Sequence, residues 1–249
     1  MLVLATPSCG HELPEYQTRL IQPSESLAPR TTPAASEAPP PQASFFDDFN
    51  RPDTAFGLGD GWDLRGAEPP TSARALINQA QDGFISSGRF TYAGKDVVSA
   101  MRQFRGKVLR VGAFGRWTRA QRGAESTMAI AITPTERLTY DMVHLAVNRS
   151  VWELTVRRRG GPLESVATGQ FSPILAIDRE YQFEVEADER SVTVRVPGRE
   201  ITQKVALSGL LGDHAYWQQY PDRKPAGVVF AFDSVWAAEA GHTLRPVHR

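Results

Sequence analysis

The sequence contains one cysteine, Cys9, among 249 residues. A single cysteine excludes an internal disulfide and a thiolate zinc site, so neither can hold this chain together. No apolar run approaches the roughly 20 residues that a membrane-spanning helix needs. The 28 basic residues balance the 28 acidic ones, so no overall field attracts nucleic acid or anionic lipid. The composition therefore predicts no nucleic-acid partner and no transmembrane segment.

Residues 1–43 have few large apolar side chains and are rich in Pro, Ser, Thr and Ala. Proline cannot donate to a β-ladder, and so few apolar groups cannot offset the entropy lost on ordering. We expect a disordered arm that holds residues 44–249 away from a surface or an assembly. Residues 1–10 partly resemble the end of a lipoprotein signal with Cys9 as the lipidated residue, but a basic start and a full apolar stretch are missing. The alternative for Cys9 is an ordinary exposed thiol.

From Phe45 onward, apolar and polar residues alternate with period two, and helical periodicity is nearly absent. The clearest segment is 181–196, which predicts a hairpin, and further strands are expected at 107–114, 127–132, 142–147, 152–156, 201–205 and 228–232. Residues 97–105 favour a strand, 76–85 a hairpin turning at Asp82-Gly83, and 206–226 a long irregular segment. Many short strands without long helices predict an all-β antiparallel sandwich, jelly roll or barrel.

Two stretches carry a resemblance to a known superfamily. The first reads Phe46-Asp47-Asp48-Phe49-Asn50-Arg51-Pro52-Asp53 and continues at Leu58-Gly59-Asp60-Gly61-Trp62, and the second is the predicted hairpin with its following glycine, residues 181–198. They resemble the concanavalin A-like (laminin G-like) jelly-roll superfamily, also found in minor tail proteins of phages that infect actinobacteria. The resemblance implies an antiparallel β-sandwich over about residues 45–236. Because lectins, glycan hydrolases, lyases and structural modules share this fold, it does not select a function.

Aromatic side chains are the first candidates for ligand binding, because sugar rings stack on exposed aromatic faces. Tyr216, Trp217 and Tyr220 lie in the expected irregular segment, and Trp117 lies beside two arginines. His144 alternates with the apolar residues of its strand, so it is a candidate on the opposite face. Burial in the core is the alternative for the aromatic residues, since Trp and Tyr are mostly buried in part.

Paired carboxylates are the candidates for catalysis, because a glycosidase needs two of them about 5–10 Å apart. Glu184 and Glu186 share one face of a strand, and Glu153 could face the same way from another strand. Residues 184–189 do not match the Glu-x-Asp core of the superfamily's glucanases. A lyase would instead use His144 with an arginine such as Arg102. His144 has no recognisable partner for a catalytic triad.

Three aspartates suggest a structural calcium site. Asp47 and Asp48 point to opposite faces of a strand, so one of them would join Asp233 and backbone carbonyls around the ion. The alternative is an aspartate that caps a turn or forms an ion pair with Arg51.

Three functional hypotheses follow. The leading one is a non-catalytic surface or virion-associated module that binds a glycan or a cell-envelope polysaccharide, or that assembles with virion or surface proteins. Such a module would be extracellular, at the cell surface or in a phage virion. The alternatives are a polysaccharide hydrolase or lyase, and a structural scaffold without a ligand.

Overall fold

The computed structural model describes residues 43–55, 57–59, 61–65, 83–92, 97–119, 126–138, 140–221 and 227–240. The predicted arm up to residue 42, with Cys9, lies outside the described residues, as do Asp60 of the opening motif and residues 76–82 of the expected hairpin. Among the residues described, no helix is long and apolar enough to cross a membrane.

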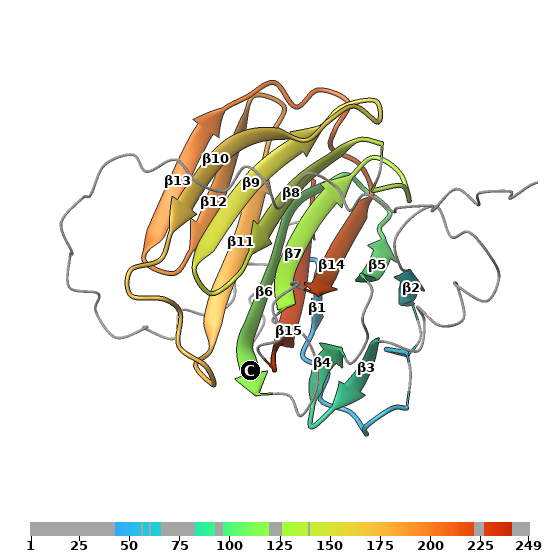
Figure 1. Cartoon of the computed structure of the whole chain (residues 1–249). Helices are drawn as coiled ribbons and strands as arrows, with labels where there is room; N and C mark the ends of the chain where they lie inside the picture. Colours follow the sequence, from blue (N-terminus) through green and yellow to red (C-terminus); the bar gives the residue numbers. More distant parts are fainter. Residues whose placement is uncertain are drawn as a thin grey trace, which may run out of the picture. The chain divides into compact units, whose positions relative to one another are not determined.

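The described chain forms strands and no helix (Figure 1). The strands are β1 (Phe45–Asp47), β2 (Asp63–Arg65), β3 (Gly83–Ser86), β4 (Arg89–Tyr92), β5 (Val98–Gln103), β6 (Val108–Arg119), β7 (Ser126–Thr133), β8 (Met142–Val147), β9 (Val151–Arg157), β10 (Glu164–Gln170), β11 (Tyr181–Ala187), β12 (Ser191–Val196), β13 (Arg199–Lys204), β14 (His214–Pro221) and β15 (Val228–Glu239).

Two antiparallel sheets make up the sandwich. Sheet A has the order β13-β12-β11-β6-β15-β4-β3, with β1 also paired to β15. Sheet B has the order β10-β9-β8-β7-β14-β5-β2. The predicted all-β antiparallel sandwich is therefore confirmed.

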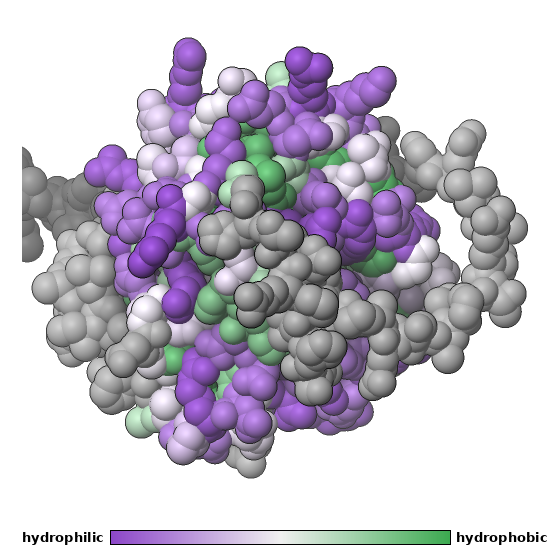
Figure 2. Space-filling view, turned by 180° about the vertical axis from the view of Figure 1, so that it is seen from behind, coloured by the Kyte–Doolittle hydropathy of each residue, from purple (hydrophilic) through white to green (hydrophobic). Residues whose placement is uncertain are grey.

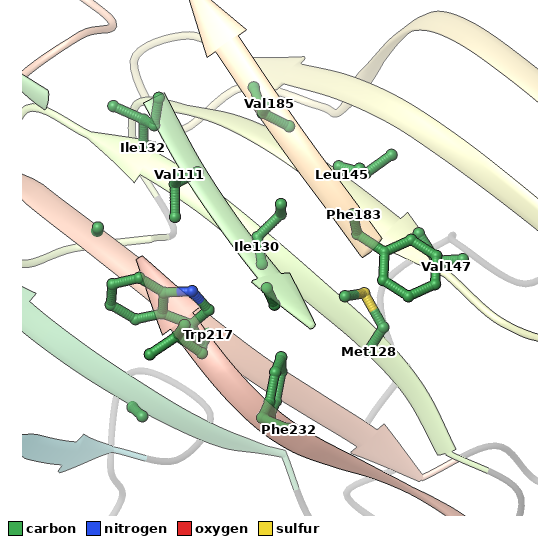
Figure 3. Close-up of a cluster of buried hydrophobic side chains, with 14 of the residues drawn as sticks. Val111, Met128, Ile130, Ile132, Leu145, Val147, Phe183, Val185, Trp217 and Phe232 are labelled. Atoms are coloured by element: carbon green, nitrogen blue, oxygen red, sulfur yellow. The ribbon is translucent and has the colours of Figure 1, made fainter. Parts of the chain in front are cut away.

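The core lies between the sheets and is built by the alternation seen in the sequence. On β7, Met128, Ile130 and Ile132 point inward and are fully buried, and they face Phe183 and Val185 of β11 (Figure 3). Burying each such side chain contributes about 1.5–3 kcal/mol. Among the residues that are coloured in Figure 2, hydrophilic ones predominate on the face seen from behind. Along each strand, the residues that alternate with the core positions point to the outer face of the sheet.

Several strand predictions are confirmed and two are wrong. Segment 181–196 forms the hairpin β11–β12, followed by β13, and residues 98–103 form β5. The hairpin of β3 and β4 turns at Ser87-Gly88, both with positive φ, and Gly83 lies inside β3. A two-residue turn with positive φ at both positions matches the twist of the paired strands. The expected irregular segment contains β14, which pairs with both β7 and β5 at the centre of sheet B.

Candidate functional site

The outer face of sheet B carries a group of polar side chains around small ones. Cross-strand pairs define its rows, and the row through His144 reads Thr155, His144, Ala131, Tyr216 and Met101. The adjacent row reads Glu153, Ala146, Ala129, Gln218 and Ser99. Because the central strand β7 contributes only alanines to these rows, larger side chains from β8 and β14 can meet above it.

These larger side chains form a hydrogen-bonded chain that we call the polar network: Thr155, His144, Tyr220, Gln218 and Ser99. His144 Nε2 lies 3.1 Å from Tyr220 Oη, and the Tyr220 hydroxyl donates to Gln218 Oε1 at 2.6 Å. Gln218 Nε2 then donates to Ser99 Oγ at 2.7 Å. At the other end, Thr155 Oγ1 lies 3.5 Å from His144 Nδ1. Four strands of sheet B are linked in this way.

The network determines which ring nitrogen of His144 carries the proton. Tyr220 has one hydroxyl proton and donates it to Gln218, so His144 must donate its Nε2–H to Tyr220. Burial lowers the pKa of His144 to about 4, the contact with Gln218 acts in the opposite direction, and the nearby charge of Arg157 lowers the pKa further. His144 is therefore neutral near pH 7, and the network consists of neutral groups.

Only part of this site reaches the surface. His144, Thr155, Gln218 and Ser99 are buried. Tyr220, Ala146, Glu153 and Arg157 are half-buried and form the accessible rim. A ligand on this face would therefore touch Tyr220 and the rim, while the buried residues hold Tyr220 in position.

Among the predicted aromatic residues, Tyr220 is the one in reach of a ligand. Trp117 and Trp217 are fully buried, and their indole N–H groups donate to the carbonyls of Ser126 and Gly112 at 3.0 and 2.9 Å. Tyr216 lies on the outer face of sheet B but is also fully buried, and its hydroxyl donates to the carbonyl of Glu136 at 2.6 Å. The side chains of Trp117, Trp217 and Tyr216 therefore stabilise the fold.

The three glutamates suggested for catalysis do not come together. Glu153 lies on β9 of sheet B, whereas Glu184 and Glu186 lie on β11 of sheet A. The expectation that Glu153 faces the same way as the other two is wrong, because β9 and β11 belong to different sheets.

Glu184 and Glu186 instead belong to an ion cluster on the outer face of sheet A. Arg195 pairs with both glutamates, and Arg110 Nη2 lies 2.9 Å from Glu186 Oε2. Burial raises the pKa of Glu184 although Arg110 and Arg195 oppose the shift, whereas these arginines outweigh burial at the half-buried Glu186 and lower its pKa. Trp236 Nε1 also donates to Glu184 Oε2 at 3.3 Å. Both carboxylates are therefore tied to arginines.

Two of the three aspartates of the calcium prediction, Asp47 and Asp233, also have arginine partners. Asp47 accepts two hydrogen bonds from Arg51, at 2.7 and 2.9 Å, and Asp233 accepts from Arg89 and Arg116 at 2.6 and 2.9 Å. Asp48 accepts from the backbone N–H of Asn50 at 3.0 Å. No group of three acidic, His or Cys side chains suited to a metal occurs in the part of the chain described. A calcium ion at Asp47 or Asp233 would have to displace arginines, and the site stays a prediction.

Arg102, suggested as a lyase partner of His144, lies elsewhere. Its guanidinium carbon is 4.3 Å from the ring centre of Phe45, and it donates to the carbonyl of Gly61 at 3.2 Å. The arginine whose charge reaches His144 is Arg157. The sequence does indicate that Arg157 lies on the outer face of sheet B, because Thr155 and Arg157 alternate along β9 with the core residues Leu154 and Val156. Ser99 and Gln218 carry no such signal in the sequence.

No family model and no curated protein matches the sequence. Solved structures do match its fold. The catalytic domain of an endo-1,3-beta-glucanase (laminarinase) from Thermotoga petrophila is similar with a TM-score of 0.53 at 10% identity, covering 81% of this chain and 98% of that domain. SCLam, a non-specific endo-beta-1,3(4)-glucanase from family GH16, gives a TM-score of 0.55 at 8% identity, with 80% and 92% covered.

The carbohydrate recognition domain of Emp47p gives a TM-score of 0.54 at 10% identity, with 78% of this chain and 93% of that domain covered. The chain therefore has the concanavalin A-like jelly-roll fold, as its opening motif and hairpin predict. At these identities the similarity shows the fold alone, and a function has to be argued from the site.

Proposed function

We propose that the protein is a non-catalytic module that recognises a glycan on the outer face of sheet B. The observation that carries this proposal is the polar network, which holds the half-buried Tyr220 from below through His144 and Gln218. A tyrosine offers a sugar both a ring face and a hydroxyl. Because its hydroxyl is already oriented, less conformational entropy is lost on binding.

The similar structures support a ligand of this class. Two of them are named as glucanases and one as a carbohydrate recognition domain. The same fold thus serves both cleavage and recognition of carbohydrate in those proteins. In our proposal the predicted proline-rich arm of residues 1–43 acts as a stalk at a cell surface or in a virion, and an envelope polysaccharide is the ligand.

The distribution of carboxylates supports recognition rather than hydrolysis. Hydrolysis of a glycosidic bond needs two carboxyl groups on either side of the bond. The central strands β7, β8 and β14 of sheet B contain no Asp or Glu within their bounds. Glu153 on β9 lies at the rim without a second carboxylate on these neighbouring strands.

One contact favours a second function, a polysaccharide lyase. In β-elimination the proton on the carbon next to a sugar carboxylate moves to a base, and the glycosidic C–O bond at the neighbouring carbon breaks. A C=C double bond forms, and the leaving oxygen takes up a proton. Tyr220 would give its hydroxyl proton to the leaving oxygen and take up the carbon-bound proton in its place, while His144 Nε2–H, 3.1 Å from the phenol oxygen, would stabilise the negative charge on it. This candidate requires an acidic polysaccharide.

The test is binding of the full-length protein to a panel of neutral and acidic polysaccharides, with reducing ends and the ultraviolet absorbance of unsaturated products followed in the same wells. Binding without cleavage supports the module. New reducing ends without absorbance indicate a hydrolase, and both signals together indicate a lyase. If no polysaccharide binds, the proposed function is wrong.

Variants then locate the binding surface. Tyr220→Phe removes the hydroxyl that donates to Gln218 and should weaken binding about five- to tenfold, the loss of about one hydrogen bond. Tyr140→Phe is the matched control, because Tyr140 is 48% exposed in the turn between β7 and β8. Equal effects of the two variants would contradict a site at Tyr220.

A further inference from the structure

Arg157 differs from the other half-buried arginines on the described strands of the two sheets. Its Nε is buried and has no hydrogen-bond partner. Its neighbour Arg158 pairs with Glu164, while Arg110 and Arg195 pair with glutamates and Arg116 with Asp233. No ion pair formed by the described residues includes Arg157.

An unpaired, half-buried guanidinium is costly, because burial removes part of its hydration without providing an acceptor in return. Arg157 lies at the end of β9, opposite Met142, and two residue pairs beyond the Thr155–His144 pair. Two residues along a strand span about 7 Å. The free guanidinium thus lies beside the rim of the polar network, on the same outer face as Tyr220.

The charges around Arg157 leave this position open to an anion. On its own strand, the next outer-face residues are the neutral Thr155 and then Glu153, about 13 Å away by strand rise. On the adjacent strand β8, the outer-face residues Met142, His144 and Ala146 are uncharged once His144 is neutral. On the other side, Glu164 of β10 is already paired with Arg158.

We propose that Arg157 is the subsite for an anionic group of the glycan, so that the ligand is an acidic polysaccharide carrying carboxylate or sulfate groups. A guanidinium binds either oxyanion through two parallel N–H donors. This inference rests on the proposed glycan function and adds the class of ligand. Tyr220 then contacts the sugar, and Arg157 contacts its charged substituent.

The experiment compares matched polysaccharides with the full-length protein. Dextran and dextran sulfate differ in sulfate groups, and polygalacturonate supplies carboxylates. The wild type should bind at least one of the two acidic polymers at least tenfold more tightly than dextran, and the polymer that binds identifies the oxyanion. Arg157→Gln should remove about ten- to hundredfold of that affinity, as expected for a charge-assisted hydrogen bond.

Two control variants distinguish specific binding at Arg157 from nonspecific attraction of an acidic polymer to positive charge on the protein. Arg199→Gln removes an equal charge from the exposed strand β13 of sheet A and should leave binding unchanged. Arg157→Lys keeps the charge but loses the paired donors, so it should recover only part of the affinity. If Arg157→Gln and Arg199→Gln have equal effects, Arg157 is not the subsite.

The outcome also separates this inference from the proposed function. Binding of dextran or other neutral glycans that depends on Tyr220 but not on Arg157 would overturn the acidic ligand and leave glycan recognition standing. Failure of every polysaccharide to bind would overturn both. The thermal midpoint of Arg157→Gln is measured alongside, and an unchanged or raised midpoint shows that the fold does not depend on this charge.

Discussion

Acid should destabilise this protein through His144 at pH values where carboxylates are still ionised. The imidazole is fully buried, and burial holds its pKa at about 4 against an ordinary value of 6.5. Between these two pH values the unfolded chain binds a proton at His144 that the folded chain does not. The unfolded state is therefore favoured as the pH falls through this window.

The magnitude follows from the difference between the two pKa values. The contribution of neutral His144 to stability is complete above pH 6.5 and is lost by pH 4, and the total is about 3 kcal/mol. For comparison, a whole domain is stable by only about 5–15 kcal/mol. This one residue should thus account for a large share of the acid sensitivity.

The assay is urea unfolding at several pH values between 7 and 4, for wild type and for His144→Gln. The variant cannot titrate at this position, so its stability should fall by about 2–3 kcal/mol less than that of wild type over the same range. Comparing the slopes cancels the loss of the hydrogen bond itself and the titration of other groups. Equal slopes, or an NMR titration of the His144 ring near pH 6.5, would refute the reasoning.

Three further predictions concern stability. Gly112→Ala would place its Cβ 2.3 Å from the ring of Trp236, so it should lower the free energy of unfolding in denaturant by about 1–3 kcal/mol. Adding Trp236→Leu to this variant should recover part of the loss, and an unchanged stability of Gly112→Ala would contradict the packing. Glu184→Ala should lower the free energy of unfolding by about 3 kcal/mol, because it removes the buried carboxylate that pairs with Arg195. Glu186→Ala removes a half-buried carboxylate and should lower it clearly less, and the reverse order would be inconsistent with the burial of Glu184. Trp217→Ala should cost about 3–5 kcal/mol through the cavity it creates, and retention of full stability would show that Trp217 is not in the core.

Strand alternation predicted most of sheet A and part of sheet B, and β14 shows where this signal ends. Its residue Gln219 is fully buried in the interior, and neither side-chain atom has a hydrogen-bond partner. A polar residue at a core position breaks the period-two pattern, and the glycines and prolines nearby resemble those of a loop. Pairing with both β7 and β5 makes this segment a strand, and pairing partners are not encoded in local periodicity.

The candidate site was predicted less completely than the fold. His144 was recognisable in the sequence as a polar residue that alternates with the apolar residues of its strand. Tyr220 was recognisable as an aromatic residue in a segment expected to be irregular. Their contact joins residues 76 positions apart and depends on β7 lying between β8 and β14 with alanines on its outer face. The same arrangement buries Trp217 and separates Glu153 from Glu184, although their residue types alone suggested a shared site.

The sequence by itself thus determined the all-β class, the hairpin of β11 and β12, and the resemblance to the concanavalin A-like jelly roll, because side-chain alternation and turn residues act within a few positions. The tertiary structure decided which sheet each strand joins, and with it which side chains share a face. It left Arg157 without a partner while it paired the arginines near Glu184 and Asp233. Charge pairing depends on distances across strands, and those exist only once both sheets have formed.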